Sequence, residues 1–117
     1  MTTTPVHIAV TVDVNDLEGM TRFWSELLGV EAEISEPFAF LSPGEGREIA
    51  VWLQRVPEPR VGKNRVHLDF RAEVMAEEVA RLQGLGARVI AERSLGRLTW
   101  TVMADPEGNE FCVSGDA

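Results

Sequence analysis

Two histidines in matching surroundings are the residues of this chain best suited to act together. His7 stands near the start of a run in which apolar and polar residues alternate, and His67 stands in a second such run about 60 residues later. An imidazole transfers protons near neutral pH and is the commonest metal ligand among side chains. Because a chain built twice from one unit tends to pair its halves, we predict that both histidines share one site. That site either holds a metal ion or lines a pocket without one.

The elements that must position these histidines also occur twice. Alternation with a period of two predicts strands at 6–12 and 65–71, and helical spacing of apolar residues predicts helices at 17–28 and about 74–83. Asp16 is placed to cap the first helix and Gly29 to end it, whereas no good capping residue precedes the second helix. Three further strands follow each helix, at 30–35, 38–41 and 48–56, then at 87–92, 97–104 and 109–114. We therefore predict one domain over residues 1–117, with modules at about 5–56 and 65–114.

The strand alternation also predicts one apolar face, packed on the helices, and one face rich in reactive side chains. Trp52 is costly to expose, and several polar residues on its face are types that bind metals or move protons, which favours a cleft lining over plain solvent exposure. A structural role for His67, bonded to Asp69, is the simpler alternative. The predicted cleft residues are His7, Thr11, Trp52, Gln54, His67, Asp69, Glu110, Cys112 and Ser114.

Composition narrows the classes of partner. The formal net charge of −8 argues against nucleic acid and against anionic membrane surfaces. A single cysteine excludes an intrachain disulfide, and the sequence has neither a signal-peptide pattern nor an apolar run long enough for a membrane span. We therefore expect a cytoplasmic protein whose partner is a small molecule.

The chain resembles the vicinal oxygen chelate superfamily, which includes glyoxalase I, extradiol dioxygenases, and fosfomycin- and bleomycin-resistance proteins. Small bacterial glyoxalase-like proteins are the most similar members, and the resemblance covers nearly the whole chain. It rests on six segments in their order along the chain: His7-Ile8-Ala9-Val10, Phe23-Trp24-Ser25-Glu26-Leu27-Leu28-Gly29-Val30, Leu53-Gln54-Arg55-Val56-Pro57-Glu58, Val66-His67-Leu68-Asp69, Leu85-Gly86-Ala87 and Ala104-Asp105-Pro106-Glu107-Gly108-Asn109-Glu110-Phe111.

This resemblance implies an α+β fold of two βαβββ modules whose mixed sheets curl around a cleft. It also implies a homodimer, in which modules of different chains often complete each other's sites. Metal-binding members use one residue on each of four strands, and those positions correspond here to His7, Gln54, His67 and Cys112. Both histidines match, but both carboxylates are replaced.

The replaced carboxylates leave two readings of the cofactor open. His7, His67 and Cys112 would suit one divalent metal (Zn, Ni, Fe or Mn), while a buried cysteine also serves as a small packing residue in a site without metal. Gln54 cannot act as a base, so the glyoxalase I reaction itself is not expected.

Two functions remain in competition. The first is metal-assisted lyase, isomerase or dioxygenase chemistry on a small oxygen-rich molecule, with His7, His67 and Gln54 as catalytic residues. Substrate contacts would come from Trp52, Asp69, Trp100 and Glu110. The alternative is metal-free sequestration of a small molecule, as in bleomycin resistance. A regulatory dimer with a degenerate site is a third and weaker hypothesis. The substrate, the reaction, and whether one chain or two form the site stay open.

Overall fold

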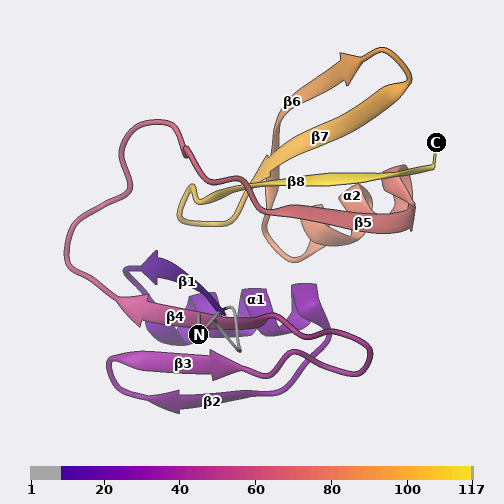
Figure 1. The fold of residues 1–117 in the computed structure, drawn as a ribbon. Helices are drawn as coiled ribbons and strands as arrows, with labels where there is room; N and C mark the ends of the chain where they lie inside the picture. The colour runs from indigo at the N-terminus through magenta and orange to yellow at the C-terminus, as the bar shows by residue number, and fades with distance from the viewer. Residues whose placement is uncertain (1–8, 117) are drawn as a thin grey trace, which may run out of the picture. The chain divides into compact units, whose positions relative to one another are not determined.

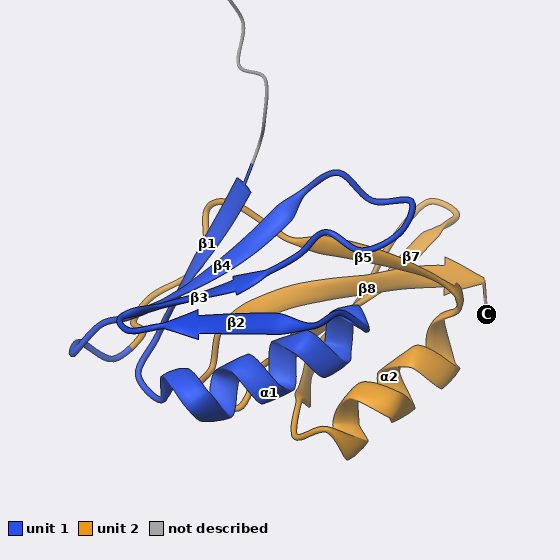
Figure 2. Cartoon of the chain, turned by 90° about the horizontal axis from the view of Figure 1, so that it is seen from below, with its two compact units in different colours: residues 1–59 blue, residues 60–117 orange. Residues whose placement is uncertain are grey.

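The computed structural model describes residues 9–116, which fall into two compact units. The first unit ends at Pro59 and the second begins at Arg60 (Figure 2). Each unit folds as strand, helix and three strands (Figure 1), which confirms the predicted α+β class and its two βαβββ modules. Neither helix in residues 9–116 is long and apolar enough to cross a membrane.

The first unit is a four-stranded mixed sheet with one helix. Its strands lie in the order β1-β4-β3-β2, with β1 parallel to β4 and the other neighbours antiparallel. The elements are β1 (Ala9–Val14), α1 (Leu17–Leu28), β2 (Ala32–Ser35), β3 (Phe38–Leu41) and β4 (Ala50–Arg55).

The second unit repeats this topology. Its strands lie in the order β5-β8-β7-β6, with β5 parallel to β8. The elements are β5 (Asp69–Val74), α2 (Met75–Gly84), β6 (Arg88–Leu95), β7 (Leu98–Ala104) and β8 (Glu110–Asp116).

Local chemistry fixes the ends of α1 as predicted. The Asp16 carboxylate accepts a hydrogen bond from the Gly19 amide at 3.1 Å, and Gly29 ends the helix with φ of 67°. The buried stripe of α1, including Leu17 and Trp24, packs on the sheet. By contrast, α2 begins directly after β5 and has no side-chain cap.

Each sheet has one face in a core and one face turned away from its helix. In β4, Val51 and Leu53 are buried, while Trp52 and Gln54 on the opposite face are half-buried, which confirms the predicted alternation. In the second unit Met103, Phe111 and Val113 fill the core. We call the face opposite the helix the open face of each sheet.

Two of the strand boundaries that differ from the sequence-based expectation bear on the site. β5 begins at Asp69 rather than near residue 65, because the Glu110 carbonyl accepts from the Asn64 side chain at 3.1 Å instead of from a strand residue. β6 continues to Leu95, beyond the expected end at residue 92, since its antiparallel pairing with β7 continues to Leu98. The first difference leaves His67 in the segment before β5, and the second adds Arg93 to a strand.

Candidate functional site

A pocket of about 500 Å³ lies on the open face of the second sheet. It crosses all four strands, because the register aligns Asp69 of β5, Cys112 of β8, Val102 of β7 and Ala91 of β6 in one row. Pockets of this size suit small organic ligands.

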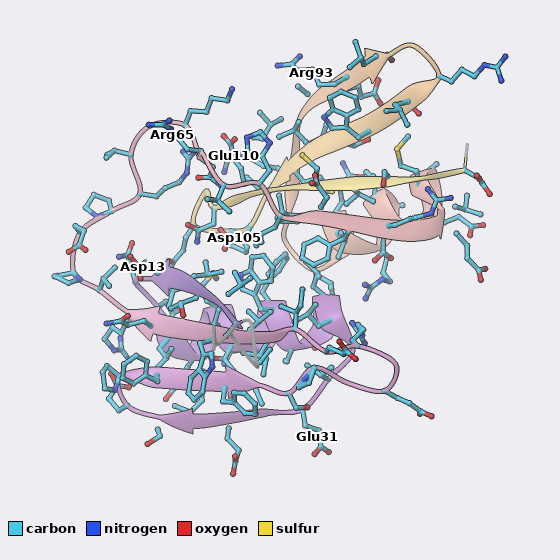
Figure 3. The ribbon with its side chains drawn as sticks, viewed as in Figure 1. Asp13, Glu31, Arg65, Arg93, Asp105 and Glu110 are labelled. Atoms are coloured by element: carbon cyan, nitrogen blue, oxygen red, sulfur yellow. The ribbon has the colours of Figure 1, made fainter. Side chains whose placement is uncertain are left out.

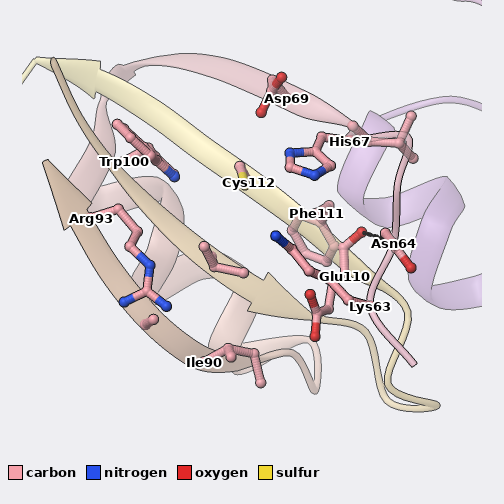
Figure 4. Close-up of a pocket in the computed structure, with 13 residues that line it drawn as sticks. Lys63, Asn64, His67, Asp69, Ile90, Arg93, Trp100, Glu110, Phe111 and Cys112 are labelled. Carbon is pink, nitrogen blue, oxygen red and sulfur yellow. Dashed lines mark hydrogen bonds between the residues drawn. The ribbon is translucent and has the colours of Figure 1, made fainter. Parts of the chain in front are cut away.

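An aromatic ring and a guanidinium group stand side by side on one wall of this pocket. Trp100 on β7 is the cross-strand partner of Arg93 on β6, and both line the pocket. Figure 4 shows Cys112 between Trp100 and His67, so the imidazole lies across the floor from the indole. The pocket therefore combines a flat apolar surface with a fixed positive charge.

Cys112 forms the floor and holds its proton. Burial raises the pKa of the Cys112 thiol, and the negative charge of Asp69, the hydrogen bond to Asp69 and the charge of Glu110 raise it further. The thiol is therefore neutral at physiological pH. A protonated thiol is a weak nucleophile and a poor metal ligand.

Glu110 is tied to the loop that precedes β5. Its carboxylate Oε2 lies 3.1 Å from Nη2 of Arg60, and its carbonyl accepts from Asn64 at 3.1 Å. These two contacts fasten the loop beside the start of β8 and place Lys63 on the rim of the pocket. Figure 3 shows Glu110 at this position, next to the turn that contains Asp105.

The charge of the pocket differs in sign from that of the chain. Among the residues that the structure describes, neither Lys63 nor Arg93 has an ion-pair partner, whereas the Glu110 carboxylate is matched by Arg60. Lys63, Arg93 and Arg60 thus outnumber the carboxylates of Asp69 and Glu110. An anionic group is the ligand that this surplus favours.

The structure brings five sequence-predicted residues together in the second unit and places two others in the first unit. The pocket contains His67, Asp69, Trp100, Glu110 and Cys112. Trp52 and Gln54 lie on the open face of the first sheet, and His7 lies outside the described residues.

Sequence reasoning missed the two unpaired cations. Arg93 follows the expected end of its strand, so the alternation did not assign it to the open face, and a bulge at Ile90 shifts the register of β6. Its position opposite Trp100 in a hairpin was the signal that could have found it. Lys63 lies in an irregular loop, where no periodicity marks a facing residue.

The part of the chain that the structure describes contains no complete cluster of metal-ligating side chains. Within residues 9–116, no group of three or more His, Cys, Asp and Glu side chains is arranged to hold an ion. The predicted metal set also includes His7, which lies outside the described residues.

The sequence matches one protein family over nearly its whole length. The family described as "Glyoxalase-like domain" matches residues 9–114. A curated relative, "Glyoxalase 1" of Caenorhabditis briggsae, is 26% identical over 122 aligned positions, which cover 96% of this chain. The chain spans only 43% of the length of that relative.

Solved structures share the fold at low sequence identity. A glyoxalase/bleomycin resistance protein from Albidiferax ferrireducens has a TM-score of 0.70 and 21% identity, covering 97% of this chain and all of its own. A variant of the fosfomycin resistance protein FosX from Listeria monocytogenes, complexed with Mn(II) and a dihydroxypropylphosphonic acid, has a TM-score of 0.74 and 19% identity. That alignment covers 100% of this chain and 95% of FosX.

Proposed function

This chain belongs to the glyoxalase-like domain family of the vicinal oxygen chelate superfamily, and we propose that it binds a small, oxygen-rich organic anion in the pocket of its second unit. The observation that carries this proposal is the Trp100–Arg93 pair beside the unpaired Lys63. A flat body stacks on the indole, while a carboxylate or phosphonate accepts charge-assisted hydrogen bonds from the guanidinium group.

The remaining pocket residues complete the proposed recognition. His67 and Asp69 supply polar atoms for hydroxyl or carbonyl groups of the ligand, and Glu110 keeps the rim in place through Arg60. The neutral Cys112 thiol forms a floor that neither repels an anion nor attacks it. In this proposal the protein holds its ligand by shape and charge.

A titration with benzoate tests the proposal, with neutral benzamide as the matched probe. We expect benzoate to bind more tightly and to shift the indole N–H resonance of Trp100. Arg93→Gln should weaken benzoate binding about three- to tenfold, because it removes a charge-assisted contact. Arg88→Gln, on the same strand but outside the pocket, should leave it unchanged. Equal affinity for benzoate and benzamide, or equal effects of both substitutions, would refute the proposal.

Metal-assisted lyase, isomerase or dioxygenase chemistry is the second candidate, and the Mn(II) complex of FosX favours it. For this chain it would require His7 together with His67, and Gln54 or Cys112 as further donors. Metal analysis of untagged protein, supplied with Zn, Ni, Fe or Mn under reducing conditions, tests it. Stoichiometric metal that His67→Ala abolishes would support the candidate, and protein that stays free of metal would contradict it. Gln54→Glu should raise metal affinity if residue 54 is a ligand.

The fate of the bound ligand distinguishes sequestration from catalysis. Recovery of an unaltered ligand after long incubation supports sequestration, whereas a changed ligand supports an enzyme.

We also propose a cytoplasmic homodimer, and equilibrium sedimentation should then give twice the chain mass of 12.9 kDa.

A further inference from the structure

A second hollow, of about 320 Å³, lies on the open face of the first sheet. Three aromatic rings line it: Phe38 and Phe40 from β3 and Trp52 from β4. The Phe40 and Trp52 centroids are 4.7 Å apart, and the Phe38 ring meets Trp52 edge-on at 6.2 Å with an interplanar angle of 85°. The rings thus contact one another at different inclinations instead of stacking flat, and all three line the hollow.

Carboxylates flank these rings on the same face, on the two edge strands of the sheet. The register places Glu33 of β2 directly beside Phe40, and it places Asp13 of β1 beside Gln54, which neighbours Phe38. The strand positions that alternate onto this face contain no lysine or arginine. Arg55 lies on the opposite alternation of β4, where Glu36 and the Asn15 carbonyl bind its guanidinium group.

The aromatic surface is accessible rather than packed. Phe38 is 39% exposed, while Phe40 and Trp52 are half-buried, so their ring faces are not absorbed into the core of the unit. The face of an aromatic ring carries partial negative charge and attracts a cation, most strongly when the ring is indole. A carboxylate beside the rings adds to the same preference and opposes an anion.

We propose that Phe38, Phe40, Trp52 and Glu33 form a binding site for a small organic cation of the quaternary or methylated ammonium class. Such a cation presents a spread positive charge with an apolar surface, which matches three rings and one carboxylate better than a hydrated ammonium does. The proposed site uses residues of β2, β3 and β4 in the first unit, whereas every residue that lines the anion pocket belongs to the second unit.

Choline and its neutral isostere, in which carbon replaces the ammonium nitrogen, test the proposal as a matched pair. Titration by nuclear magnetic resonance follows the indole N–H of Trp52, assigned with the Trp52→Phe variant, while the buried Trp24 serves as an internal reference. We expect choline to shift the Trp52 resonance and to bind at least about two- to fivefold more tightly than the isostere. Equal binding of the two probes, or a shift of Trp24 instead of Trp52, would overturn the proposal.

Glu33→Gln isolates the charge without altering the rings. We expect it to weaken choline binding about two- to fivefold and to leave the isostere unchanged, because only the cation senses the lost carboxylate. Glu45→Gln removes the same charge from an exposed loop of the first unit and should change neither. If both substitutions weaken choline binding equally, the net charge of the chain alone explains the binding, and the proposed site is wrong.

Trp52→Leu tests the rings, and Trp52→Phe keeps the measurement valid if the larger change unfolds the protein. Both should weaken choline binding, and phenylalanine should do so less, since its ring retains part of the attraction. Benzoate binding at Trp100 should survive both substitutions, so loss of choline binding alone identifies this site. Undiminished choline binding in both variants would overturn the proposal.

Discussion

Surroundings decide what Cys112 can do. Asp69 and Glu110 place negative charge beside a thiol that burial already keeps neutral, so its pKa lies above the ordinary thiol range. Asp69→Asn removes one of these causes. Its thiolate fraction at a given pH should therefore rise, and the pH midpoint of alkylation by iodoacetamide should move downward.

The midpoint, rather than the absolute rate, is the informative quantity for this prediction, because Cys112 is only 9% exposed and access limits the rate. Glu77→Gln on α2 removes an equal charge outside the pocket and should leave the midpoint in place. A midpoint that stays constant or moves upward in Asp69→Asn would show that the carboxylate does not control the thiol.

At the scale of the element, we expect the stability effects of substitutions at Asp16 and Gly19 to depend on each other, because both residues form the N-terminus of α1. A Cβ on Gly19 would overlap the Asp16 carboxylate, which accepts from the Gly19 amide. Asp16→Ala should cost about 1 kcal/mol as a lost cap. Gly19→Ala gains helix propensity of up to about 1 kcal/mol but displaces the cap, so its net effect should be near zero in the wild type.

In the Asp16→Ala background, the same Gly19→Ala change should stabilise, since no cap remains to be displaced. Urea denaturation of the two single variants and the double variant gives the coupling free energy. The two positions are independent, contrary to this prediction, if Gly19→Ala has one effect in both backgrounds.

Gly115 is required where β8 runs alongside β5. It has φ of 152°, and a Cβ there would collide with the Ala72 carbonyl oxygen of β5. We expect Gly115→Ala to cost about 2 kcal/mol or more of unfolding free energy, from backbone strain and the displaced strand. Gly84→Ala, at the end of α2 with open space around it, should instead be neutral or gain up to about 1 kcal/mol. Similar unfolding midpoints for the two variants would disprove the requirement.

Features that depend on residues close together in the sequence could be predicted, whereas features that depend on residues far apart could not. Asp16, Gly29 and the alternation of β4 act through neighbours within one turn or one strand, so the sequence predicted the helix ends and the faces of the sheet. The contact of Asn64 with Glu110, which shortens β5, joins residues far apart in sequence and could not be predicted.

The same distinction explains the partial prediction of the site. Cys112 was expected on the open face and Trp100 as a substrate contact, and both line the pocket. Arg93 depends on how far the β6–β7 pairing continues past a bulge, and Phe38 and Phe40 gain meaning only beside Trp52 on the neighbouring strand. The pairing between strands, and not the pattern within one strand, determines which side chains stand next to one another at these positions.

At the scale of the whole molecule, the net charge of −8 acts on every charged ligand. Its field reaches about 30 Å at 0.01 M salt and about 8 Å at 0.15 M. At low salt it repels benzoate and attracts choline over the entire surface, while Arg93 and Glu33 act only at contact. Added salt screens the distant charges more than the contacts.

The two probes should therefore respond oppositely when salt rises from about 0.01 to 0.15 M. Benzoate affinity should increase because repulsion by the distant carboxylates is lost while the contact with Arg93 persists. Choline affinity should decrease because the long-range attraction is lost. Calorimetric titration at both salt concentrations measures each change in affinity. The affinity for neutral benzamide should be the same at both concentrations. If benzoate weakens in parallel with choline, the cations of the pocket, not the net charge of the chain, dominate anion binding.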